Sequence, residues 1–238
     1  DPAFVAFTAI IQIGAVIATL IYFRDDVVRL VKAWLAGITS ADKRGADYKF
    51  GWAVIIGSIP IAVVGLAFKD QIETGVRSLW LVATALIVWS GVMWLADITA
   101  KLNRHEQDAG WRDTLVIGIT QCLALIPGVS RSGATISAGL FRGLDRVAAT
   151  RMSFFLAIPA LLAAGLLEAV TKADEISKGI GWGPTLVATI ASFIVAYATV
   201  AWLLRYISKH GFGIFIIYRV GLGILLIILL SAGAISAT

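Results

Sequence analysis

Long apolar segments separated by short charged loops constrain this chain more than any other feature. Six segments of about 18–24 residues are long enough to span roughly 30 Å of hydrocarbon as helices. The mean hydropathy is +0.88, and the 59% hydrophobic share exceeds the roughly 45–50% of soluble domains. The sequence therefore predicts an all-α, polytopic integral membrane protein with six spanning helices in a single membrane domain, residues 1–238. The six segments are Phe4 to Phe23, Phe50 to Phe68, Leu79 to Ala96, Ser153 to Val170, Pro184 to Leu204 and Phe212 to Ile235.

Two shorter apolar pieces, Thr114 to Ile126 and Ile136 to Leu144, lie between the third and fourth segments. At about 13 and 9 residues, each is too short to cross a bilayer alone. Pro127 cannot continue a helix, while Gly128 and Gly133 relax the backbone and permit close approach to a ligand. We therefore expect a helical hairpin whose halves meet at an irregular loop, buried in protein or facing a wet cavity.

Lysine and arginine are distributed unevenly over the loops. The loops after the first, third and fifth spans and the stretch before the fourth are rich in them, while the other two loops hold only Lys69, Arg77, Lys172 and Lys178. Cytoplasmic loops carry the excess of basic residues, so the hairpin is predicted to enter and leave from the cytoplasmic side. The formal charge of +5 reflects this topology and predicts no nucleic-acid partner, because no basic patch with interleaved aromatics occurs.

The two halves of the chain resemble each other. Phe7 to Ile21 and Phe154 to Val170 are each followed by a polar loop and two further spans, in opposite orientation. This order is typical of an inverted-topology repeat, in which the functional site tends to lie near the membrane midplane at broken helices. Only the second repeat contains a hairpin, so we expect a second hairpin upstream of Asp1. The approximate repeats are residues 1–110 and 111–238, and the hairpin is residues 114–144.

A polar motif, PGVSRSGAT from Pro127 to Thr135, occupies the turn of the hairpin. A charge within a membrane costs at least about 2.5–3.5 kcal/mol, so Arg131 should face a cavity and hold an anion or a carboxylate. Ser130, Ser132 and Thr135 offer hydroxyl donors, and a helix starting near Thr135 would aim its free N–H groups and positive dipole end at the loop. In the alternative interpretation, the hydroxyls only satisfy broken backbone while Arg131 snorkels or pairs with an acid.

Other polar residues near the apolar segments are weaker candidates. Arg219 is an intramembrane charge, for which we expect a structural role as a partner of hairpin carbonyls or a contribution to positive potential. Gln121 is expected to form a hydrogen bond across the repeat interface or to contact substrate. His105 and His210 fall in loops and are expected to be solvated.

The stretch Gln121 to Ser137, QCLALIPGVSRSGATIS, resembles the second signature of the undecaprenyl-pyrophosphate phosphatases, the bacitracin-resistance type of integral membrane enzyme. Phe7 to Ala15 and Gly211 to Gly223 resemble the first and last spans of that family. The resemblance implies hydrolysis of a C55 polyprenyl pyrophosphate to undecaprenyl phosphate and inorganic phosphate, which recycles the lipid carrier of cell-wall synthesis. It further implies a divalent cation, Mg2+ or Ca2+, and a site on the outer face of the bacterial cytoplasmic membrane.

In this resemblance, Ser130, Arg131 and Thr135 match the positions that grip the pyrophosphate, and Ser130 and Arg131 are the expected catalytic residues. The other family signature, a glutamate-rich stretch in the first hairpin, does not occur in this chain. We therefore expect no metal ligand here and an acidic catalytic half before Asp1. Membrane lipids and a second copy of the chain, as a homodimer, are the further expected partners. The expected substrate-binding set is Ser130, Arg131, Ser132, Thr135, Gly128 and Gly133.

A second hypothesis is a transporter or flippase of a phosphorylated lipid or anion. Inverted repeats and broken helices serve alternating access as readily as catalysis. Paired glutamates and a histidine in a first hairpin would favour hydrolysis, and their absence would favour transport.

Overall fold

The apolar segments predicted from the sequence form helices. The computed structural model describes residues 2–68 and 78–237. Within those residues, every secondary-structure element longer than a single bridge is a helix. The predicted loop positions Lys69 and Arg77 lie outside the described residues. The long helices are α1 (Pro2–Tyr22), α3 (Ala46–Ala67), α5 (Leu79–Thr99), α8 (Arg146–Thr171), α10 (Trp182–Ile207) and α11 (Gly213–Ser231). The shorter helices are α2 (Arg24–Thr39), α6 (Trp111–Gln121), α7 (Arg131–Phe141) and α9 (Ala173–Lys178), with 3-10 turns η1 (Ala41–Lys43), η2 (Glu106–Asp108) and η3 (Cys122–Leu125).

Most of the long helices are suited to a membrane by themselves. Within the described residues, α3, α5, α8, α10 and α11 are each long and apolar enough to span a bilayer. The described part of the predicted first span, Ala6–Tyr22 of α1, qualifies together with α2, from which it is bent by 80°. The bend falls where the apolar sequence gives way to Arg24, Asp25 and Asp26 at the start of α2. The chain is therefore a multi-pass, all-α membrane protein, as the sequence predicts.

The chain divides into two compact units. One contains Asp1–Gly51 and Phe154–Tyr206, and the other contains Trp52–Ser153 and Ile207–Thr238. Each unit combines residues from both predicted repeats, so a repeat is not a compact unit by itself. The second unit contains the whole hairpin and is the one that positions the candidate site.

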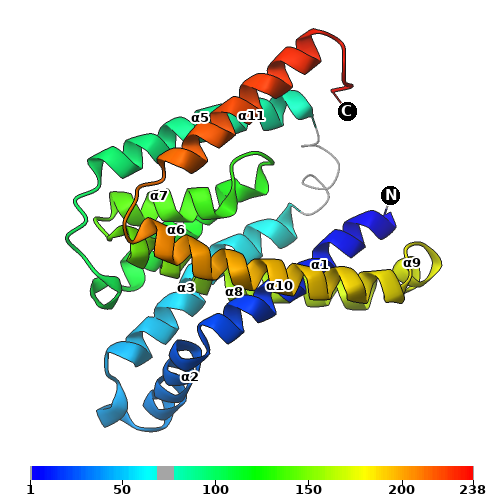
Figure 1. Ribbon diagram of the computed structural model, residues 1–238. Helices are drawn as coiled ribbons and strands as arrows, with labels where there is room; N and C mark the ends of the chain where they lie inside the picture. Colours follow the sequence, from blue (N-terminus) through cyan, green and yellow to red (C-terminus); the bar gives the residue numbers. More distant parts are fainter. Residues whose placement is uncertain (1, 69–77, 238) are drawn as a thin grey trace. The chain divides into compact units, whose positions relative to one another are not determined.

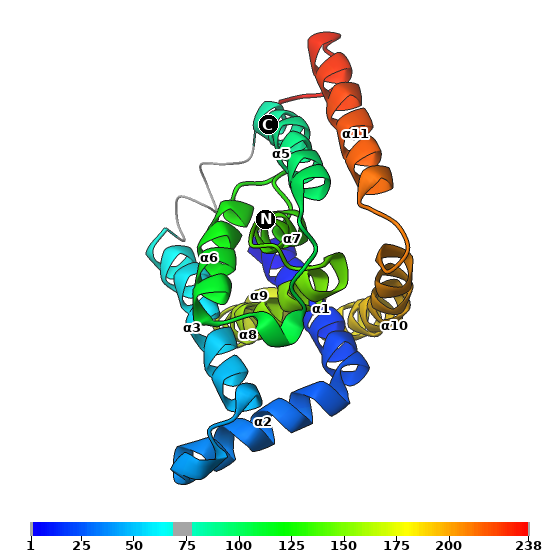
Figure 2. The ribbon, with the colours of Figure 1, turned by 90° about the vertical axis from the view of Figure 1, so that its left-hand side faces the viewer.

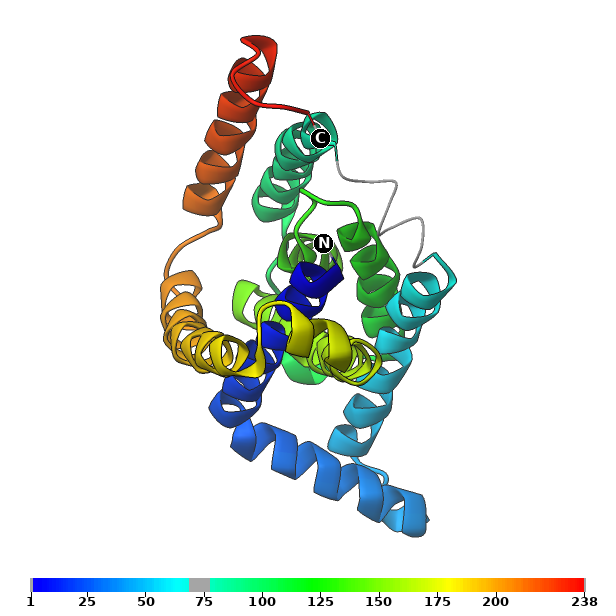
Figure 3. The same cartoon turned by 90° about the vertical axis from the view of Figure 1, so that its right-hand side faces the viewer.

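Small residues allow close helix packing in the first unit. A Cβ atom added to Gly14 of α1 would lie 2.2 Å from the Thr189 carbonyl oxygen of α10, and one added to Gly165 of α8 would lie 2.7 Å from Ile13 Cγ1. Figure 3 shows α1, in dark blue, beside the yellow segment that contains α9. Since lipid offers no hydrophobic gain between apolar helices, such backbone contact is a principal source of packing energy in membranes.

The second unit repeats this use of glycine. Helices α5 and α11 lie side by side (Figure 1), and Gly223 of α11 lies where a Cβ atom would be 3.0 Å from the Ala83 carbonyl oxygen of α5. Helix α6 lies beside α3 (Figure 2), and a Cβ atom on Gly118 would be only 1.8 Å from the Gly57 carbonyl oxygen. The hairpin is thereby fixed against a spanning helix by backbone contact.

Candidate functional site

The predicted hairpin consists of α6 and α7, which pack against each other. Each has 11 residues, or about 16 Å of helix, which is roughly half of the hydrocarbon thickness. Neither helix can cross a bilayer, so the prediction of two half-helices is confirmed. We call residues 126–133, from the end of η3 through the first turn of α7, the tip, and we call the start of α6 with the end of α7 the base.

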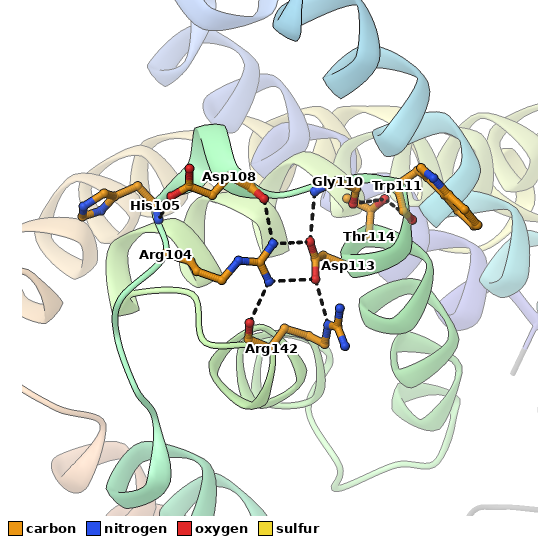
Figure 4. Close-up of polar contacts among 8 residues, drawn as sticks. All are labelled: Arg104, His105, Asp108, Gly110, Trp111, Asp113, Thr114 and Arg142. Atoms are coloured by element: carbon orange, nitrogen blue, oxygen red, sulfur yellow. Dashed lines mark hydrogen bonds and ion pairs between the residues drawn. The ribbon is translucent and has the colours of Figure 1, made fainter.

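The base is held by a carboxylate between two arginines (Figure 4). Asp113 of α6 accepts hydrogen bonds from Arg104 Nη2 at 2.7 Å, from Arg104 Nη1 at 3.1 Å and from Arg142 Nε at 2.8 Å. It also accepts the Gly110 backbone N–H at 3.0 Å, which caps α6. The side chain of Asp113 is only 4% exposed. Because Asp113 starts α6 and Arg142 follows α7, this cluster brings the two ends of the hairpin together.

The electrostatics of this cluster follow from its geometry. Burial alone would raise the pKa of the Asp113 carboxyl, but the hydrogen bonds donated to it, led by that of Arg104, outweigh burial and lower the pKa to about 2. The pKa of Arg104 is raised, chiefly by its hydrogen bond to Asp113. Both groups therefore keep their charges at neutral pH, and the base is a satisfied ion cluster.

A short backbone strap crosses the base. The Arg104 N–H donates to the Gly143 carbonyl at 3.1 Å, and the Asp145 N–H donates to the Arg104 carbonyl at 2.8 Å. The His105 ring nitrogen Nδ1 lies 2.6 Å from Asp145 Oδ2, and Glu106 is paired with Arg151 of α8. His105 remains exposed, as predicted, although it is hydrogen-bonded.

The base also joins the neighbouring helices. Asp97, near the end of α5, accepts Arg146 Nε at 2.7 Å and the Phe212 N–H, just before α11, at 3.1 Å. The end of α5, the starts of α8 and α11 and both ends of the hairpin therefore meet within the second unit. This agrees with the prediction that the hairpin enters and leaves from one side.

Helix α7 begins earlier than the sequence predicts. We expected its first residue near Thr135, but it starts at Arg131, with Ser130 as its N-cap. The Ser130 hydroxyl oxygen accepts the Gly133 N–H at 3.2 Å, and this satisfies one of the free donors of the first turn. The helix ends at Phe141 because Gly143 adopts a φ of +82°, with its N–H bonded to the Leu140 carbonyl.

The tip has an unusual backbone. Gly128 has a φ of +97°, and Ser130, which carries a side chain, has a φ of +71° and a ψ of 122°. A Cβ atom on Gly128 would lie 2.5 Å from the Val82 carbonyl oxygen, and one on Gly133 would lie 3.0 Å from Met93 Sδ. Packing on α5 therefore requires glycine at position 128, whereas at position 133 the Met93 side chain would have to shift. Ser130 stores strain, since residues outside the common φ and ψ regions cost of order 1–3 kcal/mol.

Several donors at the start of α7 have no partner within the described residues. The Arg131 Nη1 atom is buried and has no hydrogen-bond partner, and no ion pair joins Arg131 to an acid within the described residues. The backbone N–H groups of Ser130, Arg131 and Ser132 likewise have no acceptor in the described part of the chain. The Ser130 and Ser132 hydroxyl oxygens are 3.4 Å apart. Such a set of donors at a helix start is suited to an anion.

Thr135 is placed differently from the other predicted ligands. It is wholly buried, one turn inside α7, and its hydroxyl lies 2.9 Å from the Arg131 carbonyl and 2.7 Å from Ser153 Oγ of α8. In this position it joins α7 to α8 and is not presented with the hydroxyls of Ser130 and Ser132. The predicted binding role of Thr135 stays a prediction.

Arg219 fulfils the structural role expected of it. Its Nη2 atom donates to the Gly128 carbonyl at 2.7 Å and to the Val129 carbonyl at 3.1 Å, and its Nε atom donates to Ser90 Oγ at 3.2 Å. Helix α11 thus supplies a guanidinium that ties the tip to α5.

Gln121, at the end of α6, is placed unexpectedly. Its side chain is wholly buried, and neither amide atom has a partner, so the expected hydrogen bond across the repeats is not formed within the described residues. His210 is exposed, as predicted.

Two parts of the site were not predicted from the sequence. In the sequence, Asp113 looks like any other acidic residue in a loop, and Ser90 is a single polar residue in an apolar span. The position of Asp113 in the first turn of an apolar segment, where a helix favours negative charge, is a signal that could have marked it. No local signal marks Ser90, because its importance depends on which helix faces it.

Comparisons with known proteins identify related chains. A family model described as Bacitracin resistance protein BacA matches residues 1–225. The chain is 60% identical over 239 residues to "Undecaprenyl-diphosphatase 3" of Frankia casuarinae, covering 100% of this chain and 86% of that protein. It is 54% identical over 240 residues to "Undecaprenyl-diphosphatase" of Cutibacterium acnes, covering 98% and 84%, respectively. It is 50% identical over 240 residues to "Undecaprenyl-diphosphatase" of Mycobacterium marinum, covering 100% and 85%.

Proposed function

The chain belongs to the bacitracin resistance protein BacA family, and we propose from this premise that it hydrolyses undecaprenyl pyrophosphate at the hairpin tip. The products are undecaprenyl phosphate and inorganic phosphate, so the chain is a polyprenyl-diphosphate phosphatase of the membrane. The observation that carries the placement of the site is the buried Arg131 Nη1 atom, which has no partner in the described part of the chain.

The terminal phosphate of the substrate would take the place of the missing acceptors. Its oxygens would receive the N–H groups of Ser130, Arg131 and Ser132 and the fork of the Arg131 guanidinium. Ser130 Oγ accepts the Gly133 N–H, and when the Ser132 hydroxyl also donates to it, its own proton can be donated to a phosphate oxygen. We therefore propose Ser130, Arg131 and Ser132 as substrate-binding residues, with Gly128 and Gly133 shaping the loop.

The reaction transfers the terminal phosphoryl group to water. The water oxygen bonds to the terminal phosphorus, the bond from that phosphorus to the bridging oxygen breaks, and undecaprenyl phosphate leaves with the electron pair. Phosphoryl transfer is largely positioning and charge stabilisation. Arg131 and the N–H donors would stabilise the equatorial oxygens, on which negative charge is spread in the transition state.

The position of the tip along α5 supports access from the outer face. The base contacts Asp97 near the end of α5, whereas Gly128 packs against Val82, about one turn from its start. The arginine-rich base is assigned to the cytoplasmic side by the excess of basic residues. The tip then lies in the outer half of the membrane.

A homodimer remains an expectation.

A divalent cation is the one implied component that these residues do not accommodate. Within residues 2–68 and 78–237, no group of three His, Cys, Asp or Glu side chains is arranged to hold a metal ion. The tip offers hydroxyls, N–H groups and a guanidinium, whereas Mg2+ and Ca2+ require oxygen ligands, chiefly carboxylates. We retain metal dependence as a proposal and assign no step of the reaction to a metal.

The test is phosphate release from C55 pyrophosphate by the full-length protein in detergent, with Mg2+, with Ca2+ and with a chelator. Arg131→Ala should lower kcat/KM by about 10²–10³-fold, since it removes a charged transition-state donor. The matched control is Arg112→Ala, because the Arg112 guanidinium lies over the Trp111 ring near the base, away from the tip. Lipid binding without phosphate release by the wild-type protein would overturn the phosphatase and favour a flippase.

A further inference from the structure

We propose that Arg219 is a positioning residue that holds the Val129–Ser130 peptide in the strained orientation needed for phosphate binding. This inference rests on the proposed function of the tip. It adds a residue of α11, about 90 positions further along the chain, to the machinery of the site. Arg219 does not itself contact the substrate in this proposal, because its Nε and Nη2 atoms donate to protein oxygens.

The guanidinium of Arg219 is fixed before it reaches the tip. Its Nε atom donates to Ser90 Oγ at 3.2 Å, and the Ser90 hydroxyl in turn donates to the Leu86 carbonyl at 2.6 Å, so Ser90 presents a lone pair to the guanidinium. Gly223, one helical turn beyond Arg219, is the residue that lets α11 approach α5. The planar guanidinium of Arg219 is therefore held in a fixed position when it binds the tip carbonyls.

The two carbonyls that Arg219 binds decide where the tip amides point. A trans peptide is planar, with its C=O and N–H on opposite sides. When the Val129 carbonyl points at Arg219, the N–H of the same peptide, which belongs to Ser130, points away from Arg219. That N–H is one of the three without an acceptor at the start of α7, within the described residues.

Strain in Ser130 shows why this peptide needs a restraint. Rotating the Val129–Ser130 peptide by half a turn changes ψ of Val129 and φ of Ser130 and leaves the rest of the chain nearly in place. Such a flip would take Ser130 from a φ of +71° to a relaxed negative value. It would also turn the Val129 carbonyl oxygen toward the substrate, where it would repel phosphate. Arg219 thus maintains the binding orientation against a local preference for the opposite one.

A double-mutant cycle tests this mechanism in the full-length protein in detergent. Arg219→Ala should lower kcat/KM for C55 pyrophosphate by about 10- to 100-fold per folded protein, as expected for lost charge-assisted hydrogen bonds. Glycine adopts positive φ without strain, so in the Ser130→Gly background the same substitution should cost at most about 5-fold. Tyr218→Phe, at an exposed position of the same helix, is the control and should be unchanged.

The outcomes separate the two proposals. No phosphate release by the wild-type protein would overturn the proposed function. An active wild type with an equally active Arg219→Ala variant, or the same fold loss in both backgrounds, would overturn the role of Arg219. If Arg219→Ala does not fold, the cycle is run with Arg219→Lys, which keeps the charge but loses the fork. The loss should again be larger in the wild-type background than in the Ser130→Gly background, and equal losses would again overturn the proposal.

Discussion

The base and the tip of the hairpin both contain arginine, but the arginines at the base have an acidic partner and the one at the tip has none. At the base, Arg104 and Arg142 converge on the buried Asp113, and both donate hydrogen bonds to its carboxylate. At the tip, the Nη1 atom of Arg131 is buried without an acid, and three backbone N–H groups have no acceptor within the described residues. The base is satisfied by its own chain, whereas the donors at the tip are the ones that we propose for binding phosphate. Paired charges therefore indicate architecture here, and unpaired ones indicate function.

Backbone conformation also differs between the two regions, although Leu102, two residues before Arg104, has a φ of +50°. The base is organised by an ordinary helix end with a glycine at positive φ. The tip contains Ser130 at positive φ, supported from outside by Arg219. At the tip, the strained residue lies beside unpaired donors, and this combination argues for preorganisation.

The largest effect on activity should come from removing the Arg131 guanidinium at the tip. Arg131→Met should lower phosphate release by about 10²–10³-fold, because the charged donor is lost from the transition state. It should not lower the unfolding midpoint, since an apolar side chain of similar length replaces a buried guanidinium without a partner. Activity per folded protein and thermal unfolding in the same detergent measure the two quantities. A large loss of stability would mean that Arg131 is a structural residue like Arg104.

The same kind of truncation at the base should have the opposite result. Asp113→Ala leaves two arginines without their shared acceptor, so we expect the free energy of unfolding to fall by about 3 kcal/mol. Activity per folded protein should fall by less than about 10-fold, because the donors at the tip remain. An SDS unfolding titration in mixed micelles provides the measurement. Asp42→Ala, at an exposed position on η1, is the matched control and should change the free energy by no more than about 0.5 kcal/mol. A stable but inactive Asp113→Ala variant would contradict the division between base and tip.

The pH dependence of stability should identify the base cluster. The Asp113 pKa is about 2 in the folded protein, against about 3.9 for an unperturbed aspartate. A lowered folded pKa stabilises the protein above the unfolded value, so this contribution should persist down to about pH 4 and disappear as the pH falls toward 2. The difference in unfolding midpoint between wild type and Asp113→Asn should shrink over that interval. A difference that stays constant from pH 6 to about pH 2 would rule out this assignment.

The smallest effect tests the strain at the tip. Ser130→Gly removes the unfavourable φ, which is worth about 1–3 kcal/mol, but it loses the cap and adds chain entropy to the unfolded state. We expect a stability between unchanged and about 1 kcal/mol higher, together with lower activity. Ser132→Gly, two residues on in ordinary helix, should instead lose about 0.5–1 kcal/mol. If both substitutions destabilise the protein equally, Ser130 is not strained.

Much of this architecture follows from local features of the sequence. Segment lengths and hydropathy determine the spanning helices, because hydrocarbon forces every backbone group to be satisfied within a helix. The two short pieces around Pro127 determine that a broken hairpin exists, and PGVSRSGAT determines where its polar turn lies. The excess of basic residues near Arg104 and Arg142 predicts that both hairpin ends share one side.

The start of α7 lies between local and tertiary control. The sequence predicted a helix near Thr135, and the structure begins it at Arg131, because the Ser130 hydroxyl caps the first turn. Ser130, Ser132 and Thr135 each have a hydroxyl that can cap a helix. Their spacing in the sequence does not choose among them.

Only the tertiary structure decided which polar groups are paired. Asp113 meets Arg142 across 29 positions and Arg219 meets Gly128 across 91, while Thr135 turns to Ser153 and away from the tip. Hydropathy and turn chemistry act over a few residues, whereas these pairings depend on which helices are neighbours and how closely their glycines let them approach. The sequence by itself determined the solvent, the helices and the polar turn, and the packing of α5, α7 and α11 decided which arginine supports the turn and which is left for the ligand.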